Sequence, residues 1–204
     1  ILEEKYLKKG HSLIAGVDEA GRGSWSGPVV AAAVVFPYEK WAEIIKIGLD
    51  DSKKLSPKRR RHFFDIILEN SDVGIGLSSV QEIDNINILQ ATFLAMNRAL
   101  ENLNNDPDYT LIDGDKIPPV KFPAEAIVNG DALSISIAAA SIISKVTRDN
   151  LMTKLSRSSP GYGWEHNVGY GTKKHREGLE TFGVTKHHRK SYKPIINILG
   201  QHNN

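Results

Sequence analysis

Cysteine is absent from the 204 residues of this chain, and long apolar runs are absent as well. Without cysteine there is no disulfide framework, no cysteine-based zinc site and no thiol nucleophile. The longest apolar run, residues 29–36, has the length of a buried strand and falls far short of the ~20 residues that cross a membrane. No secretory signal, internal repeat or low-complexity segment is visible. These absences fit the reducing cytoplasm, which is the localisation we expect, with no membrane partner.

A strong net charge is also missing, since 26 Lys and Arg residues stand against 24 Asp and Glu residues, a formal charge of +2. The distribution of charge is more informative than the total. Residues 53–61 contain six basic residues and no acidic one, and residues 171–193 contain seven Lys or Arg, two Glu and three His. Two basic clusters on a nearly neutral chain predict a groove for a polyanion, although solvated helix faces would give the same composition.

Hydrophobic residues make up 40% of the sequence, enough for the core of one large domain. Alternating apolar residues and turn signals predict strands at 12–18, 29–36, 73–77, 109–113 and 125–128. Helical periodicity and capping signals predict helices at 57–70, 87–103 and 132–155, with shorter pieces at 41–47 and after Ser79. Residues 1–11 are charged and are expected to be a short lead-in.

This interleaving of strands and helices predicts an α/β chain, with about five strands in a central sheet flanked by helices. The character of the sequence changes after Ser156, where Gly, Tyr, Trp and His give way to a basic, helical C-terminal stretch. We therefore expect a catalytic domain at 1–160 and a basic helical segment at 161–204 packed on it as a single structural unit.

Acidic residues stand at three junctions between predicted elements. Asp18 and Glu19 follow the first strand, Asp113 ends the fourth, and Asp131 precedes the long helix. The strand ends along one edge of an open α/β sheet are where a site is usually built. Four hard oxygen ligands there predict a magnesium-type cation. Two such cations would activate a water and stabilise the leaving oxygen in the hydrolysis of a phosphate ester.

Each acid also has a simpler interpretation. Asp131 alone suits a helix cap after Asn-Gly, and Asp113 alone suits a turn before Gly114. Asp18 and Glu19 together are harder to explain, because two acids after an apolar strand serve no packing purpose. Successive strand residues point to opposite faces, so Glu19 would need the following turn to bring it beside Asp18.

The turn after the first strand carries a distinctive pattern. Gly-Val-Asp-Glu-Ala-Gly-Arg-Gly at 16–23, followed by Gly-Pro-Val-Val-Ala-Ala-Ala-Val at 27–34, resembles the opening of type 2 ribonuclease H, the ribonuclease HII family. Further motifs similar to those of that family follow in its order, at 51–56, 111–114, 139–149 and 169–175. The resemblance thus covers nearly the whole chain.

The resemblance implies a ribonuclease H-like fold and an endonuclease that hydrolyses the RNA strand of RNA–DNA hybrids. It also implies nicking 5′ to ribonucleotides embedded in duplex DNA, with 5′-phosphate and 3′-hydroxyl products. The family holds Mg²⁺ or Mn²⁺ with four acids, which match Asp18, Glu19, Asp113 and Asp131. The partners it implies are a hybrid or ribonucleotide-containing duplex and the metal, and we expect a monomer.

Substrate contacts follow from the same resemblance. The 2′-hydroxyl is the feature that marks RNA at a given sugar, and the family turn matching Gly21, Arg22 and Gly23 contacts it. Tyr170 matches a tyrosine that packs against the next sugar, with an ordinary half-buried tyrosine as the alternative. Trp25 departs from the residues commonly found before Gly-Pro in relatives, as does Ser26, so packing beside the turn is expected to differ.

Phosphate contacts are expected from basic and hydroxyl side chains. The candidates are Lys53, Lys54, Ser141 and Lys145, with Ser144 and Arg148 on the same helix as further ones. Their simpler interpretation is close packing for the serines and solvation for the charges. None of the seven histidines has a convincing site.

Two other functions fit parts of the sequence. A dinucleotide loop would use Gly21, Gly23 and Gly27, but their spacing is wrong and a strand follows where that motif needs a helix. A non-catalytic hybrid binder would share the fold, but it would not need all four acids. Among nucleases, the type 3 relative usually has Gly-Lys-Gly where this chain has Arg22, so type 2 is the firmer choice.

Overall fold

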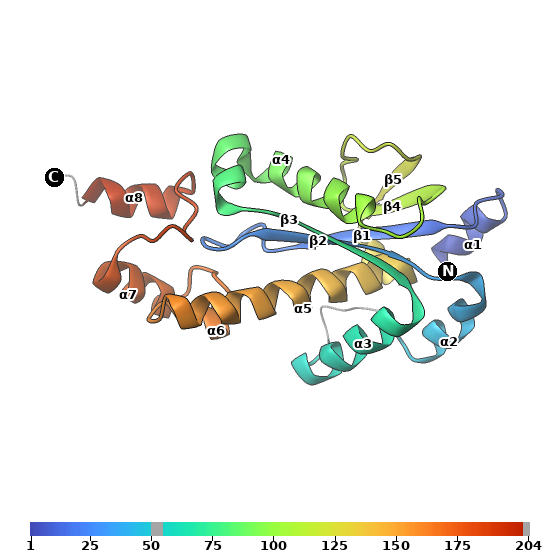
Figure 1. The fold of residues 1–204 in the computed structure, drawn as a ribbon, viewed down its shortest axis with the longest axis horizontal. Helices are drawn as coiled ribbons and strands as arrows, with labels where there is room; N and C mark the ends of the chain where they lie inside the picture. Colours follow the sequence, from blue (N-terminus) through green and yellow to red (C-terminus); the bar gives the residue numbers. More distant parts are fainter. Residues whose placement is uncertain (50–54, 202–204) are drawn as a thin grey trace.

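A five-stranded mixed sheet forms the centre of the computed structural model, which describes residues 1–49 and 55–201 (Figure 1). The strands are β1 (Ile14–Ala20), β2 (Val29–Val35), β3 (Asp72–Ser78), β4 (Tyr109–Asp113) and β5 (Ala124–Ile127), in the order β3-β2-β1-β4-β5. β1, β2 and β3 are antiparallel neighbours, whereas β4 runs parallel to β1 and β5 parallel to β4. The predicted mixed sheet is confirmed.

Helices cover both faces of this sheet. The helices are α1 (Leu2–Leu7), α2 (Trp41–Lys46), α3 (Pro57–Asn70), α4 (Val80–Glu101), α5 (Ile135–Ser158), α6 (Trp164–Asn167), α7 (Lys173–Phe182) and α8 (Lys193–Gln201), with 3-10 turns η1 (Tyr38–Lys40) and η3 (Gly130–Ala132). In Figure 1, α4 lies on one face of the sheet, and α5 lies on the other with α3. The predicted flanking helices are confirmed, and within the expected N-terminal lead-in residues 2–7 form a short helix.

Strand β2 explains the two-layered core. Ala32 and Val34 point into the cluster on the α5 side, and Ala31 and Ala33 point into the cluster on the α4 side. Because both faces are covered, the strand is apolar at every position. Helix α5 lies directly on β1, since a Cβ added at Gly16 would come within 2.2 Å of the α5 backbone.

Two element boundaries differ from the prediction in ways that affect the acids. Strand β1 continues to Ala20, so Glu19 is held inside the strand by pairing with Ala31, and no turn is needed to orient it. Helix α5 begins only at Ile135, where the Ser134 hydroxyl accepts the N–H of Ile137. The cap interpretation of Asp131 is therefore wrong, because this residue lies in the preceding turn η3.

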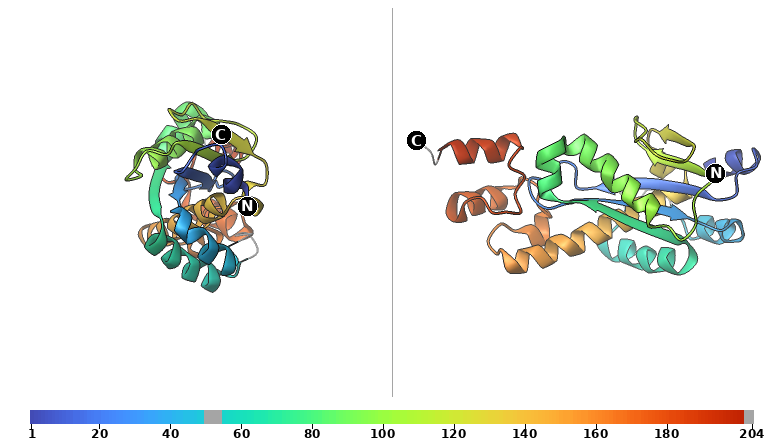
Figure 2. Two further views of the ribbon diagram at one scale, coloured as in Figure 1. Left: turned by 90° about the vertical axis from the view of Figure 1, so that its right-hand side faces the viewer. Right: turned by 45° about the horizontal axis from the view of Figure 1, so that its top comes forward.

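The C-terminal helices gather at one end of the molecule. Figure 2 shows α7 and α8 at the end opposite α1 and α2. A third apolar cluster joins this region to α5 through Met152, with Tyr162, Trp164, Leu179 and Ile195. The boundary at residue 160 stays a prediction. No helix in the described ranges is both long and apolar enough to span a membrane.

Candidate active site

A cleft of about 420 Å³ opens where β1 and β4 end. Its lining residues come from six parts of the chain. They are Asp18, Glu19 and Ala20 of β1, Gly21, Arg22 and Gly23 of the turn, Arg60 of α3, Asp113 of β4, Ser141, Lys145 and Arg148 of α5, and Tyr170. The structure thus brings together the predicted turn, tyrosine, serine and lysine and three of the four predicted acids. The remaining candidates Lys53 and Lys54 lie outside the described residues.

Strand pairing places the acids together. The parallel register aligns Val17 with Ile112, so the next residues, Asp18 and Asp113, stand side by side at the carboxyl ends of two neighbouring strands. Glu19 follows on β1 and lines the same cleft. An edge of this kind is where open α/β sheets bind ligands.

Burial and mutual repulsion govern the charge of these carboxyls. Asp18 is only 5% exposed, and burial together with the negative charges of Glu19 and Asp113 raises its pKa well above the usual range. The Glu19 N–H, 2.7 Å from Asp18 Oδ1, and the Ser141 hydroxyl act in the opposite direction. Burial also raises the pKa of Glu19, against the opposing effect of Arg22, whose Nη1 lies 3.4 Å from Oε1. Burial therefore opposes negative charge on both carboxyls.

Asp131 occupies a neighbouring position. It is buried and lines a separate cavity of about 190 Å³ rather than the cleft. The two sites are connected through Gly130, whose N–H donates to Asp113 Oδ1 at 2.8 Å. Its assignment as a fourth ligand stays a prediction.

The chemistry of the donors fits a hard divalent cation. Carboxylate oxygens are the ligands that Mg²⁺ and Mn²⁺ prefer, and a cation would offset the repulsion that raises the pKa of Asp18. The carboxylates line one cleft, but they do not form a ready-made coordination shell. In the described ranges, no group of three or more His, Cys, Asp or Glu is arranged to hold a metal ion.

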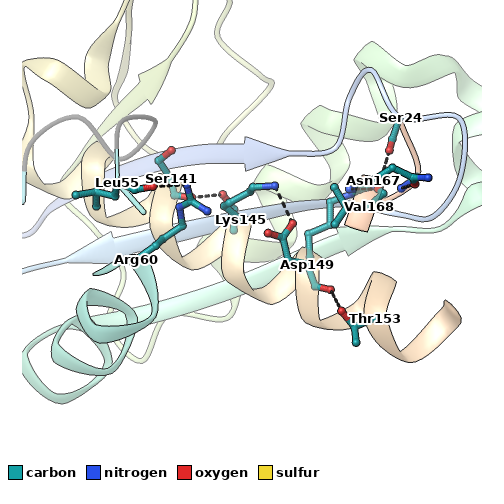
Figure 3. Close-up of polar contacts among 12 residues, drawn as sticks. Ser24, Leu55, Arg60, Ser141, Lys145, Asp149, Thr153, Asn167 and Val168 are labelled. Carbon is teal, nitrogen blue, oxygen red and sulfur yellow. Dashed lines mark hydrogen bonds and ion pairs between the residues drawn. The ribbon is translucent and has the colours of Figure 1, made fainter. Parts of the chain in front are cut away.

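Cationic side chains line the same cleft as the acids. Figure 3 shows Arg60 of α3 reaching toward Ser141 and Lys145 of α5. Arg60 donates from Nη2 to the Leu55 carbonyl at 2.9 Å, and Lys145 pairs with Asp149 at 2.8 Å. Both remain partly exposed at the cleft. A cationic side chain that is partly exposed at such a cleft can meet a phosphate.

Arg60 was not singled out by the sequence, although it belongs to the basic cluster at 53–61. A signal does exist. Arg60 lies three residues before Phe63 and seven before Ile67, and these two side chains are the buried face of α3. At helical spacing Arg60 shares their side of the helix, which faces α5 and the cleft.

Two further candidates on α5 prove to be structural. The Ser144 hydroxyl is fully buried and donates to the Ser141 carbonyl. Arg148 is 1% exposed and donates to the carbonyls of Pro28, Ser26 and Val168 and to Ser24 Oγ. Their engagement within the protein contradicts the expected phosphate contacts.

The turn and the tyrosine line the same cleft. Gly21 has φ +94°, and a Cβ there would fall 1.9 Å from Arg148 Nε, so only glycine fits. A Cβ added at Gly23 would lie 3.5 Å from Tyr170 Cε1, so the tyrosine ring lies beside the turn. Tyr170 is 42% exposed and lines the cleft. Its side chain is therefore accessible from the cleft, although it is also partly buried, as in the alternative interpretation.

Two buried histidines lie next to the backbone of the tyrosine. His175 and His188 are fully buried, with their Nε2 atoms 3.1 Å apart. His175 Nδ1 lies 3.0 Å from the Tyr170 carbonyl, and Trp164 Nε1 donates to His175 Nε2. No sequence pattern predicts a site for these histidines, because their partners are distant in sequence.

Comparison with known proteins decides the family. The sequence profile of the family described as Ribonuclease HII matches residues 15–195. This chain belongs to the ribonuclease HII family. It is 53% identical over 201 residues to the ribonuclease HII of Ruegeria pomeroyi, covering 98% of this chain and 84% of that protein. The predicted resemblance is confirmed, and the chain is a type 2 ribonuclease H, from a family that cleaves RNA in RNA–DNA hybrids.

Solved structures agree with the fold. Ribonuclease H2 from Pyrococcus horikoshii OT3 has a TM-score of 0.80 and 27% identity, covering 94% of this chain and 99% of that one. Bst-RNase HIII in complex with Mn²⁺ has a TM-score of 0.73 and 21% identity, covering 94% and 70%. The second likeness supports the fold alone, at the level of a ribonuclease H-like sheet with flanking helices.

Proposed function

We propose that this ribonuclease HII hydrolyses the RNA strand of RNA–DNA hybrids and nicks duplex DNA 5′ to embedded ribonucleotides, leaving 5′-phosphate and 3′-hydroxyl ends. The observation that supports this most directly is a single cleft containing converging carboxylates, the Gly21–Gly23 turn and Tyr170. An acidic strand edge suits phosphodiester hydrolysis, and a glycine turn permits close approach to a sugar.

Two divalent cations, Mg²⁺ or Mn²⁺, are the cofactors we propose. Asp18, Glu19 and Asp113 would hold them, with Asp131 as the fourth predicted ligand. When bound, the cations supply an activated water and stabilise the leaving oxygen. The Mn²⁺ complex of the type 3 relative is consistent with this choice.

The chain's own side chains would orient the substrate. The backbone N–H groups of the Gly21–Gly23 turn would donate to the 2′-hydroxyl, and Tyr170 would stack against the sugar that follows. Arg60 and Lys145 would bind phosphates of the cleaved strand, with Lys53 and Lys54 as additional predicted contacts. We also propose that the protein acts as a monomer, in a reducing compartment such as the cytoplasm.

The test is cleavage of an end-labelled DNA duplex that contains one ribonucleotide, with Mg²⁺, Mn²⁺ or a chelator. We expect metal-dependent nicking on the 5′ side of the ribonucleotide and none on an all-DNA duplex of the same sequence. Asp18→Asn should abolish nicking while retaining binding. Tight binding without nicking in either metal would instead indicate a non-catalytic binder of hybrid duplexes.

A further inference from the structure

The C-terminal segment pairs with the loop that follows the glycine turn. Gly27 donates its N–H to the His187 carbonyl at 2.9 Å, and Arg189 donates its N–H to the Trp25 carbonyl at 2.9 Å. Ser26 and His188 form an antiparallel bridge between these two bonds. The pairing brings the Arg189 side chain beneath the turn.

All five N–H donors of the Arg189 guanidinium are used there. Nη2 donates to the Gly21 carbonyl at 2.7 Å and the Gly27 carbonyl at 2.9 Å, and Nε donates to the same Gly27 oxygen at 3.0 Å. Nη1 donates to the Arg22 carbonyl at 2.9 Å and to Tyr192 Oη at 2.8 Å. The Tyr192 hydroxyl itself donates to the Arg22 carbonyl at 2.6 Å. The side chain is fully buried, and no carboxylate is among these partners.

This arrangement controls the direction of the turn's N–H groups. In a trans peptide the C=O and the following N–H point in opposite directions within one plane. A restraint on the Gly21 carbonyl therefore orients the N–H of Arg22, and a restraint on the Arg22 carbonyl orients the N–H of Gly23. Both N–H groups are directed away from Arg189. A turn with two glycines has little stiffness of its own, so this external restraint is what fixes it.

We propose that Arg189, assisted by Tyr192, is a positioning residue that aims the N–H groups of the Gly21–Gly23 turn at the 2′-hydroxyl of the substrate. The inference rests on the proposed function, because it assumes that this turn reads the ribonucleotide. A cation on the carbonyl side also polarises each peptide, which strengthens the hydrogen bond its N–H donates. The C-terminal segment thereby contributes to substrate discrimination without touching the substrate.

The test compares Arg189→Lys and Tyr192→Phe with the wild type on the single-ribonucleotide duplex. Lysine keeps the charge but cannot span three carbonyls, so we expect kcat to fall by roughly 10- to 100-fold, as for a misplaced site. Tyr192→Phe, which removes one exposed hydroxyl, should lower kcat by several-fold in the same direction. Affinity for the all-DNA duplex should stay within about two-fold, because phosphate contacts dominate non-specific binding.

Arg98→Gln provides a matched control. Arg98 also bonds a carbonyl, that of Leu77, and pairs with Glu82 at 2.7 Å on α4, but it does not line the cleft. The Arg98→Gln variant should be less stable than the wild type but should keep the wild-type kcat. Thermal melting of each variant identifies the temperature at which all are folded, and kinetics are measured there.

The outcomes separate the two proposals. If the wild type does not nick the ribonucleotide duplex in any metal, the proposed function fails. If the wild type nicks it and both variants keep the wild-type kcat, only the positioning role of Arg189 fails. Should Arg189→Lys not fold, Tyr192→Phe alone decides, and an unchanged kcat for that variant overturns the inference.

Discussion

Two groups of like-charged side chains lie beside the Gly21–Gly23 turn, and the protein surrounds them in opposite ways. Asp18, Glu19 and Asp113 face one cleft, and the pKa of Asp18 is raised by burial and by its acidic neighbours. Arg148 and Arg189 are also buried, and burial followed by their mutual repulsion lowers the pKa of Arg148 to about 10. The arginines, however, have carbonyl partners for their donors.

The difference indicates that the acids serve the reaction, whereas the arginines hold the structure in place. A buried cation whose donors are all satisfied holds its surroundings in place, and its removal leaves carbonyls unpaired. Acids that repel one another contribute little to stability and are kept for what they bind. Loss of an acid should therefore affect catalysis, and loss of an arginine should affect the fold or the shape of the turn.

Asp18→Asn is expected to have the largest effect. Activity should fall by on the order of 10³-fold, because a group that stabilises the reacting phosphate is lost. The metal-free free energy of unfolding at neutral pH should be unchanged or increased, since a buried negative charge is removed. Initial rates and urea unfolding measure the two quantities. The matched control is Asp115→Asn, which lies outside the cleft; equal losses in both variants would contradict the assignment.

Arg148→Met should have the opposite effect to Asp18→Asn, because its main consequence should be a loss of stability. The substitution leaves Ser24 and the carbonyls of Ser26, Pro28 and Val168 without their donor, so we expect destabilisation by about 3 kcal/mol. Lys154→Met, at an exposed position of the same helix, should change stability by less than about 0.5 kcal/mol. Urea unfolding of both variants measures the difference. Similar free energies of unfolding for the two would contradict a structural role of Arg148.

The contrast also marks what the sequence could predict. Helix α3 matches its predicted range because Ser56 and Pro57 are local start signals. Asp18, Glu19 and Asp113 were found because they stand at the end of apolar strands, a pattern visible within a few residues, whereas Asp131 stands before the long helix. The end of β1 was missed because Glu19 is held by its pairing with Ala31, a tertiary contact that no local pattern encodes.

Buried arginines and histidines were beyond sequence reasoning for the same reason. Arginine is usually exposed, and the partners of Arg189 are backbone carbonyls, which leave no mark on residue identity. The separate cavity of Asp131 likewise depends on where α5 begins, and the predicted helix started three residues too early. Long-range polar contacts, rather than element types, account for most of what was missed.

The buried histidine pair should make this region sensitive to acid. Burial, with smaller effects of His175 and His187, lowers the pKa of His188 to about 3, and burial also lowers that of His175. A folded-state pKa below the unfolded value gives full stability above about pH 6.5, which is lost as the pH falls toward the folded value. We expect a loss on the order of 2 kcal/mol between about pH 7 and pH 5.

Urea unfolding as a function of pH measures this loss. His188→Asn keeps an acceptor for the Thr185 N–H, which His188 Nδ1 accepts at 3.0 Å, and removes one titrating group. Its stability should therefore depend less steeply on pH than that of the wild type. An unchanged slope would show that the acid sensitivity arises elsewhere.

Lys145→Gln should have the smallest effect and tests the exposed side of the comparison. Lys145 is paired with Asp149 four residues along α5 and remains about one-third exposed, and such pairs contribute only about 0.3–0.5 kcal/mol to stability. If the lysine binds a phosphate, the slope of log affinity against log salt should become shallower by about 0.9. The control is Lys121→Gln, which should leave the slope unchanged, because the Lys121 side chain is 82% exposed and pairs with Glu101, at 4.0 Å. Binding of both variants is titrated in an Asp18→Asn background, so that the substrate is not cleaved. Equal salt slopes for Lys145→Gln and Lys121→Gln would show that Lys145 does not bind a phosphate and would leave that role to Arg60 and the remaining basic residues.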